Sequence, residues 1–279
     1  MTADPQASDT QPRRGPQSPR RSRHLRGRRA FALIALLLGL AGFALSATGL
    51  AIQLLPRQFT AAQQQQIVNW EIASRWQRLT AGQIFPATIG YQLSPTLLQD
   101  ATPLSVAALR IGVAPQSGCG AGVTTSAAAT VLRRDGCQAV LRATYVDATQ
   151  SYVVTVGVAV LPSDAAAKRA SQSLSQPRLT AINRADTNSL AAGILVVRYH
   201  GTAAAMYDYS RQISVSFAQG PYLIMYAAGY ADSRPRVPVS SDRYSYTEMR
   251  ILAASVAQSV ADTLAAPPVR PHCPGTPGC

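Results

Sequence analysis

The stretch Leu141–Leu161, LRATYVDATQSYVVTVGVAVL, determines which fold this chain can adopt. Apolar and polar side chains alternate up to residue 145, residues 147–150 have the composition of a turn, and a β-branched run follows from Tyr152 to Leu161. One face of that run carries four valines, and the other face carries smaller or mixed side chains. The alternation, the turn residues and the β-branched run together predict a β-hairpin.

Three more strands and two helices are predicted downstream of the hairpin. After Pro162, the capping residue Ser163 begins a helix that continues to about Leu174. Strands are predicted over residues 193–199, 212–217 and 222–228. The last of these is apolar on both faces, so we expect it to be central in the sheet. A second capping box, Ser245–Glu248, predicts a final helix that ends at Pro267.

Upstream of the hairpin, residues 60–79 are predicted to form a helix. Thr60 and Gln63 have the spacing of a capping box. Apolar side chains at Val68, Ile72 and Trp76 share one face of this helix. That face requires an apolar neighbour, which is the following domain, the membrane interface or another copy of the helix. Packing against the domain is the favoured interpretation.

The run from Ala30 to Leu55 contains 26 consecutive residues without a formal charge. As a helix it exceeds the roughly 30 Å thickness of the hydrocarbon core of a bilayer, so it predicts a single transmembrane helix. Eight arginines precede it, whereas Arg57 alone follows closely. This bias places the N-terminal tail in the cytoplasm and the C-terminal part outside the cell.

Two alternative interpretations of this N-terminal region remain open. A cleaved signal peptide would have its core at residues 31–43, but the apolar run continues well beyond the usual core length of about 7 to 15 residues. The pair Arg28–Arg29 is also similar to a twin-arginine export signal. We favour the uncleaved anchor.

The predicted order of elements gives an α+β fold, in which helices cover one face of an antiparallel sheet behind a single transmembrane helix. Five segments follow in chain order. They are a disordered basic cytoplasmic tail (1–29), the transmembrane helix (30–55), a juxtamembrane helix (56–79), an extracytoplasmic α+β domain (80–266) and a Pro/Gly/Cys tail (267–279).

The net charge of +13 invites a nucleic-acid interpretation, but the distribution of charge does not favour it. The tail of residues 1–29 supplies +6 through eight arginines and two aspartates. The other basic residues are scattered, with no run longer than a pair. We therefore predict no nucleic-acid partner and expect the bilayer, with its anionic lipids, as the partner of the tail.

All four cysteines follow the predicted span, on its oxidising side, and an even count there favours disulfides. Three pairings are open, and we favour Cys119 with Cys137 and Cys273 with Cys279. The first bond would close the glycine-rich loop that begins at residue 117. A metal site at His272, Cys273 and Cys279 has too few ligands for structural zinc, so neither a metal nor a cofactor is predicted.

Catalytic signatures are weak in the predicted outer part. A serine or cysteine nucleophile needs a neighbouring base and a group to orient that base, and no Gly-x-Ser-x-Gly elbow occurs. His200 follows a predicted strand, and several aspartates lie in predicted turns. We expect no enzyme, with a hydrolase of the cell envelope that uses His200 or a loop aspartate as the alternative.

Tyrosines are concentrated toward the end of the predicted domain, eight of them within 48 residues. Tyrosine combines a broad apolar face with a polar tip, which suits partner, peptide or sugar surfaces. The expected binding surface contains Tyr207, Tyr209, Tyr230 and Tyr244. The competing interpretation is ordinary packing of a sheet that favours tyrosine.

Lys168 is the only lysine among 26 basic residues, and the outer part is rich in Ala, Val, Ser and Thr. This composition and the one-span layout resemble the uncharacterised single-pass envelope proteins of high-GC Gram-positive bacteria. The resemblance implies a location and no activity. We expect a membrane-anchored extracytoplasmic binding or accessory domain that engages an envelope protein. The alternatives are the hydrolase and a structural stalk, a homo-oligomer formed through the juxtamembrane helix.

Overall fold

The computed structural model describes residues 31–43, 60–93, 103–175, 193–205, 211–232, 234, 237, 241 and 243–268. The chain divides into two compact units, residues 1–58 and 59–279. In the first unit, residues 31–43 form a helix. Within the described ranges no helix has both the length and the apolar character needed to cross a bilayer. Residues 30 and 44–55 of the predicted span lie outside these ranges.

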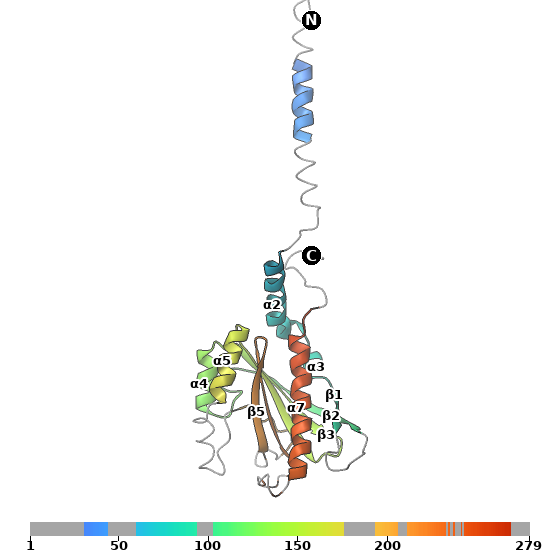
Figure 1. The fold of residues 1–279 in the computed structure, drawn as a ribbon, viewed down its shortest axis with the longest axis vertical. Helices are drawn as coiled ribbons and strands as arrows, with labels where there is room; N and C mark the ends of the chain where they lie inside the picture. The colour runs from blue at the N-terminus through green and yellow to red at the C-terminus, as the bar shows by residue number, and fades with distance from the viewer. Residues whose placement is uncertain are drawn as a thin grey trace, which may run out of the picture. The chain divides into compact units, whose positions relative to one another are not determined.

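The second unit is built on one antiparallel sheet of six strands, in the order β1-β2-β3-β4-β6-β5 (Figure 1). The strands are β1 (Thr88–Leu93), β2 (Leu104–Ser117), β3 (Ala139–Asp147), β4 (Tyr152–Val160), β5 (Arg211–Gln219) and β6 (Tyr222–Tyr230). β3 and β4 pair from Ala139↔Val160 to Val146↔Val153, which confirms the predicted hairpin. β6 is buried along its whole length between β4 and β5, as its two apolar faces predict.

Helices cover both faces of this sheet, so the prediction of helices on one face is wrong. They are α2 (Ala61–Arg78), α3 (Ala81–Ile84), α4 (Ser126–Arg134), α5 (Asp164–Leu174) and α7 (Arg243–Ala265). α7 and α3 pack with β4 and β6 in one core, whereas α4 and α5 form a second core against the opposite face (Figure 1). The physical reason is that β4 and β6 are apolar on both sides, so helices must shield each side from water.

α4 was not predicted, because its segment was interpreted only as a disulfide loop. The helix begins after Thr125, whose hydroxyl accepts a hydrogen bond from the Ala128 amide at 3.1 Å. Its inward side chains are small, apart from Val131 and Leu132. A helix of nine residues with two alanines facing the sheet leaves little apolar periodicity in the sequence.

The predicted strand over residues 193–199 is also wrong. This segment forms one isolated bridge, between Val123 and Ile194, and then crosses the second face of the sheet. The Leu195 amide donates to the Gly122 carbonyl at 2.9 Å, and further along the segment the backbone bonds to side chains of the sheet. The Val197 amide donates to Thr155 Oγ1 at 3.2 Å, and Thr144 Oγ1 donates to the Val197 carbonyl at 2.9 Å. Two buried threonines of the sheet therefore hold the segment in place.

α2 packs against the domain, as favoured from the sequence. The capping box is present, since the Gln63 amide donates to Thr60 Oγ1 at 3.3 Å and the Thr60 amide donates to Gln63 Oε1 at 3.0 Å. Ile72 and Trp76 contact the same core as α7. The capping box predicted at Ser245 is wrong, because α7 already begins at Arg243 and Ser245 lies in its first turn.

Candidate binding surface

Tyrosines from four elements meet at the N-terminal end of α7. Tyr152 begins β4 and Tyr230 ends β6, and the register pairs these two residues directly. Their ring centroids lie 5.9 Å apart in a tilted arrangement. Tyr91 comes from β1 and Tyr244 from the first turn of α7. We call these four residues, together with Glu248 of α7, the tyrosine cluster.

Glu248 provides the negative charge of the tyrosine cluster. Tyr152 Oη donates to Glu248 Oε2 at 3.0 Å. A hydrogen bond to Glu248, and the charge of that carboxylate, raise the pKa of Tyr244. Burial, reinforced by the charges of Asp147 and Glu248, raises the pKa of Tyr91 to about 12. The raised pKa values keep the hydroxyls of Tyr91, Tyr152 and Tyr244 protonated at neutral pH, so they are hydrogen-bond donors there.

A cation and a second carboxylate flank the cluster after β6. The Arg234 guanidinium lies 4.5 Å from the centroid of the Tyr230 ring, a cation–π contact. The same guanidinium forms an ion pair with Asp232, and this hydrogen bond lowers the pKa of the Asp232 carboxyl. The surroundings of the cluster thus carry both signs of charge, which suits a polar partner surface better than a purely apolar one.

The predicted binding residues differ in their exposure to solvent. Tyr244 is 54% exposed, whereas Tyr230 is 4% exposed and belongs to the core. Tyr152 and Glu248 connect the two at one end of the sheet. Tyr207 and Tyr209 lie outside the described residues.

Sequence reasoning missed three members of the cluster. Tyr91 lies in a segment to which little structure was assigned, and Tyr152 and Glu248 were interpreted only as parts of a strand and a cap. The predicted hairpin was the sequence feature that could have identified Tyr152, since it places this residue at the start of β4 next to the turn. Its partner on β6 depends on the register between strands distant in sequence, which no local pattern reports.

The disulfide between Cys119 and Cys137 is present, as favoured. It joins the loop before α4 to Cys137, three residues after the helix ends at Arg134, so α4 lies inside the closed loop. Cys119 belongs to the second core, and Cys137 packs against it. Cys273 and Cys279 lie outside the described residues.

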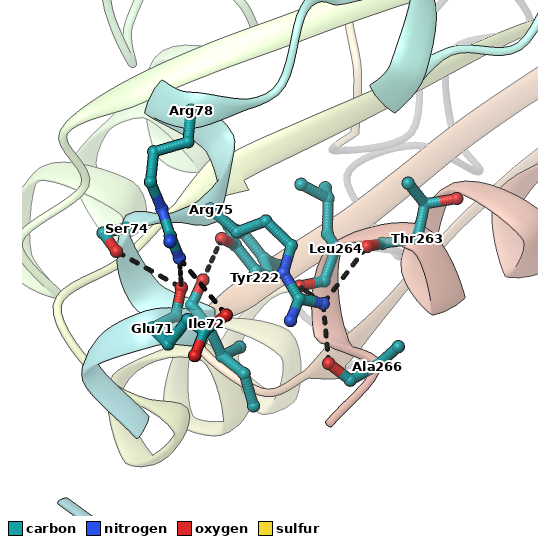
Figure 2. A network of polar contacts seen from close by, with 9 residues as sticks. All are labelled: Glu71, Ile72, Ser74, Arg75, Arg78, Tyr222, Thr263, Leu264 and Ala266. Carbon is teal, nitrogen blue, oxygen red and sulfur yellow. Dashed lines mark hydrogen bonds and ion pairs between the residues drawn. The ribbon is translucent and has the colours of Figure 1, made fainter. Parts of the chain in front are cut away.

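A second polar network joins α2 to the C-terminal end of α7 (Figure 2). Arg75 Nη1 donates to three backbone carbonyls, those of Thr263 at 3.3 Å, Leu264 at 3.2 Å and Ala266 at 2.6 Å. These carbonyls lack helical partners at a helix end, where the macrodipole also favours a cation. Arg75 therefore caps α7 from a different helix.

Two further contacts complete this junction of α2 and α7. Tyr222 Oη, from the start of β6, donates to the Ile72 carbonyl at 2.5 Å, and burial raises the pKa of Tyr222 to about 12 (Figure 2). Within α2, Arg78 Nη2 donates to the Glu71 carbonyl at 2.7 Å and lies 3.9 Å from the buried Glu71 carboxylate. The junction uses its polar groups internally, so we assign it a structural role.

The remaining sequence candidate for chemistry, His200, is exposed at the end of the segment that crosses the sheet. Across the described ranges, histidine, cysteine, aspartate and glutamate side chains form no group of three that could hold a metal ion. No protein family, curated protein or solved structure was found to match this chain.

Proposed function

We propose that this chain is a membrane-anchored, extracytoplasmic binding domain that engages a protein partner of the cell envelope through the tyrosine cluster. The observation that carries the proposal is the half-exposed ring of Tyr244, which lies in contact with the Glu248 carboxylate at the edge of a packed tyrosine group. Such rigid amphipathic rings beside a fixed acceptor are typical of protein interfaces.

The location in the membrane is proposed from the apolar run of residues 30–55. Residues 31–43 of this run form a helix, and its large apolar side chains are distributed all round the helix axis. They are Phe31, Leu33, Ile34, Leu36, Leu37, Leu38, Leu40 and Phe43. A helix that is apolar all round is expected in lipid.

The orientation is proposed from charge and redox chemistry. Eight arginines precede the apolar run, which favours a cytoplasmic N-terminus. The disulfide of the second unit fits an oxidising compartment. Together with the resemblance to single-pass envelope proteins, these features support a C-terminal domain outside the cell.

The tyrosine cluster lies at the end of the domain remote from α2. Arg75 holds the C-terminal end of α7 near Thr263, whereas Glu248 lies 15 residues earlier on the same helix. A rise of 1.5 Å per residue places the two about 23 Å apart along α7. Because the chain enters this unit through α2, the cluster is far from that entry.

A photo-cross-linker at position 244 tests the proposal in the full chain. Benzoylphenylalanine in place of Tyr244, irradiated in intact cells, is expected to give an adduct of defined mass with another protein. Gln66, exposed on α2, is the matched control position. Equal adducts at both positions, or none at 244, would contradict the proposal.

The alternatives receive less support. Ile72 and Trp76 of α2 contact its own domain, so a stalk formed through this helix would use other residues, such as Trp70, which is 48% exposed. The hydrolase interpretation remains a prediction that His200→Ala tests, since loss of a hydrolytic activity in that variant would favour it over binding.

A further inference from the structure

β5 forms one edge of the sheet in the part of the chain that the structure describes. Among the described residues, positions 213–219 pair with β6 and with no other strand. A strand at a sheet edge presents backbone amides and carbonyls that are available to another strand. The opposite edge, β1, is only six residues long, whereas β5 has nine.

From residue 213 onward, β5 has few of the features that protect a sheet edge from pairing. Residues 213–219, ISVSFAQ, include no charged residue and no proline, whereas the charged Arg211 and a break in the register with β6 lie at the N-terminal end of the strand. Val215, at the middle of β5, is 41% exposed. The strand is therefore compatible with an additional neighbour.

The hairpin between β5 and β6 fixes which backbone groups point outward. Two residues, Gly220 and Pro221, connect the paired residues Gln219 and Tyr222, and Gly220 has a φ of 56°. In a two-residue hairpin the flanking pair exchanges hydrogen bonds, and the pairs then alternate along the strands. The backbone groups of residues 214, 216 and 218 consequently face away from β6.

The sequence of β5 is complementary to itself about Val215. In an antiparallel pair of two β5 strands with the two-fold axis at Val215, Ile213 lies opposite Phe217 and Ser214 lies opposite Ser216. Ser214 Oγ is buried and has no hydrogen-bond partner among the described residues. A second copy brings a serine hydroxyl to the position opposite it.

We propose that β5 pairs antiparallel with β5 of a second copy of this chain, about an axis at Val215, so that the two sheets become continuous. In this register Val215 faces its own copy at a non-hydrogen-bonded position, where Cα atoms approach to about 4.5 Å. The outward groups of residues 214 and 216 supply the hydrogen bonds on either side. The pairing is isologous, as expected of a two-fold dimer.

Cysteine cross-linking of the full chain tests this register. Val215→Cys, oxidised in cells or in membranes, is expected to form at least roughly tenfold more disulfide-linked dimer than a randomly colliding site, because the pairing fixes the two sulfurs at bonding distance. Leu104→Cys, on an exposed residue at the other side of the sheet, measures that collision level. Ser214→Cys mixed with Ser216→Cys should also cross-link, while either one alone should give less.

Three results would overturn the proposal. One is equal cross-linking at positions 215 and 104, and another is an adduct of Val215→Cys with a different protein, which would assign the edge to a foreign strand. The third is a dimer that survives Val215→Arg in native gels, since like charges would then face each other at the axis. Val215→Thr is the control that retains pairing. Photo-cross-linking at position 244 should be unaffected by Val215→Arg, so the two proposals fail separately.

Discussion

Gly122 and Gly120 lie two residues apart in the disulfide loop but have different surroundings. A Cβ at Gly122 would lie 2.6 to 3.0 Å from three atoms of Val140, including Cβ at 2.7 Å, whereas a Cβ at Gly120 would meet only Ala129 Cβ, at 3.8 Å. Neither glycine has a positive φ. Position 122 requires glycine because the backbone there lies too close to Val140, a β-branched residue of the sheet, to leave space for a side chain.

We therefore predict that Gly122→Ala lowers the free energy of unfolding by about 1 to 3 kcal/mol through overpacking. Gly120→Ala should change it by less than about 0.5 kcal/mol. Urea denaturation of both variants measures the difference. Equal effects would show that the contact with Val140 does not limit the space at position 122.

Two buried tyrosines predict an alkaline limit to stability. Burial raises the pKa of Tyr91 and of Tyr222 to about 12, against 10.0 in the unfolded chain. Between these values the folded state binds more protons, so stability is complete below pH 10 and falls as the pH rises toward 12. The decrease is up to roughly 2.7 kcal/mol for each tyrosine. Denaturation midpoints from pH 8 to 12 test this, and Tyr222→Phe should flatten the decline.

At the residue scale, Tyr244 could be recognised from sequence because tyrosines are enriched around it. Its neighbours could not, since Tyr152 and Tyr230 meet only through the pairing of β4 with β6. Tyr91 reaches the same region through β1, where the sequence carries little periodic signal. Contacts of this kind depend on register between distant segments, whereas composition reports only on local structure.

At the element scale, local signals predicted some elements and missed others. The β3–β4 hairpin and α5 were predicted because turn residues, β-branched runs and caps operate within a few positions. The segment 193–199 has the composition of a strand, yet threonine hydroxyls of the sheet bond its backbone at Val197, and no local pattern predicts that competition. Residues 80–115, which contain β1 and most of β2, were expected to form only an extended segment with one or two weak strands or turns, because glycine and proline interrupt the sequence.

The disulfide of Cys119 with Cys137 should contribute measurably to stability. The bond closes a loop across a sequence separation of 18, which corresponds to roughly 3 kcal/mol in the chain-entropy model. We expect reduction, or the double substitution of both cysteines by serine, to lower the free energy of unfolding by about that amount. Denaturation with and without reductant measures it, and an unchanged midpoint would contradict the expectation.

Arg75 should hold α2 in place on the domain. Arg75→Ala removes a charged donor from three carbonyls at and just after the C-terminal end of α7, and we expect a loss of about 2 kcal/mol of local stability. Hydrogen exchange in residues 61–78 should then accelerate by roughly 30-fold, with α4 and α5 unchanged. Arg78→Ala is the matched control, because Arg78 contacts Glu71 and Trp70 within α2 itself. Equal acceleration in both variants would contradict the assignment.

At the scale of the whole molecule, the sheet is covered on both sides, and this was the main error of the fold prediction. The apolar faces of β4 and β6 were visible in the sequence, but α4 was hidden in the glycine-rich loop. α5, which also packs in the second core, was predicted, but no local pattern showed that it covers the face opposite α7. The α+β class and the antiparallel pairing follow from the order of the strands and helices along the chain. The placement of the helices does not, because it depends on which helix packs against which face of the sheet.

The proposed membrane anchor predicts the behaviour of the full chain in fractionation. We expect the chain to stay in the membrane pellet after alkaline carbonate extraction. Replacing Leu37 and Leu38 by arginine adds about 2.5 to 3.5 kcal/mol of insertion cost per residue and should move the chain toward the supernatant. Gln64→Arg with Gln66→Arg on α2 is the control with the same change of charge. Retention of the Leu37/Leu38 variant would contradict the anchor.

The cap that Arg75 places on α7 also has a consequence for biosynthesis. Its partners lie 188 to 191 residues later in the chain. At a synthesis rate of about 5 to 20 residues per second, α2 is complete roughly 10 to 40 s before the carbonyls that it binds exist. The contact of Arg75 with the C-terminal end of α7 therefore forms only after the whole domain has been synthesised. A nascent chain that ends before residue 263 lacks the carbonyls to which Arg75 binds.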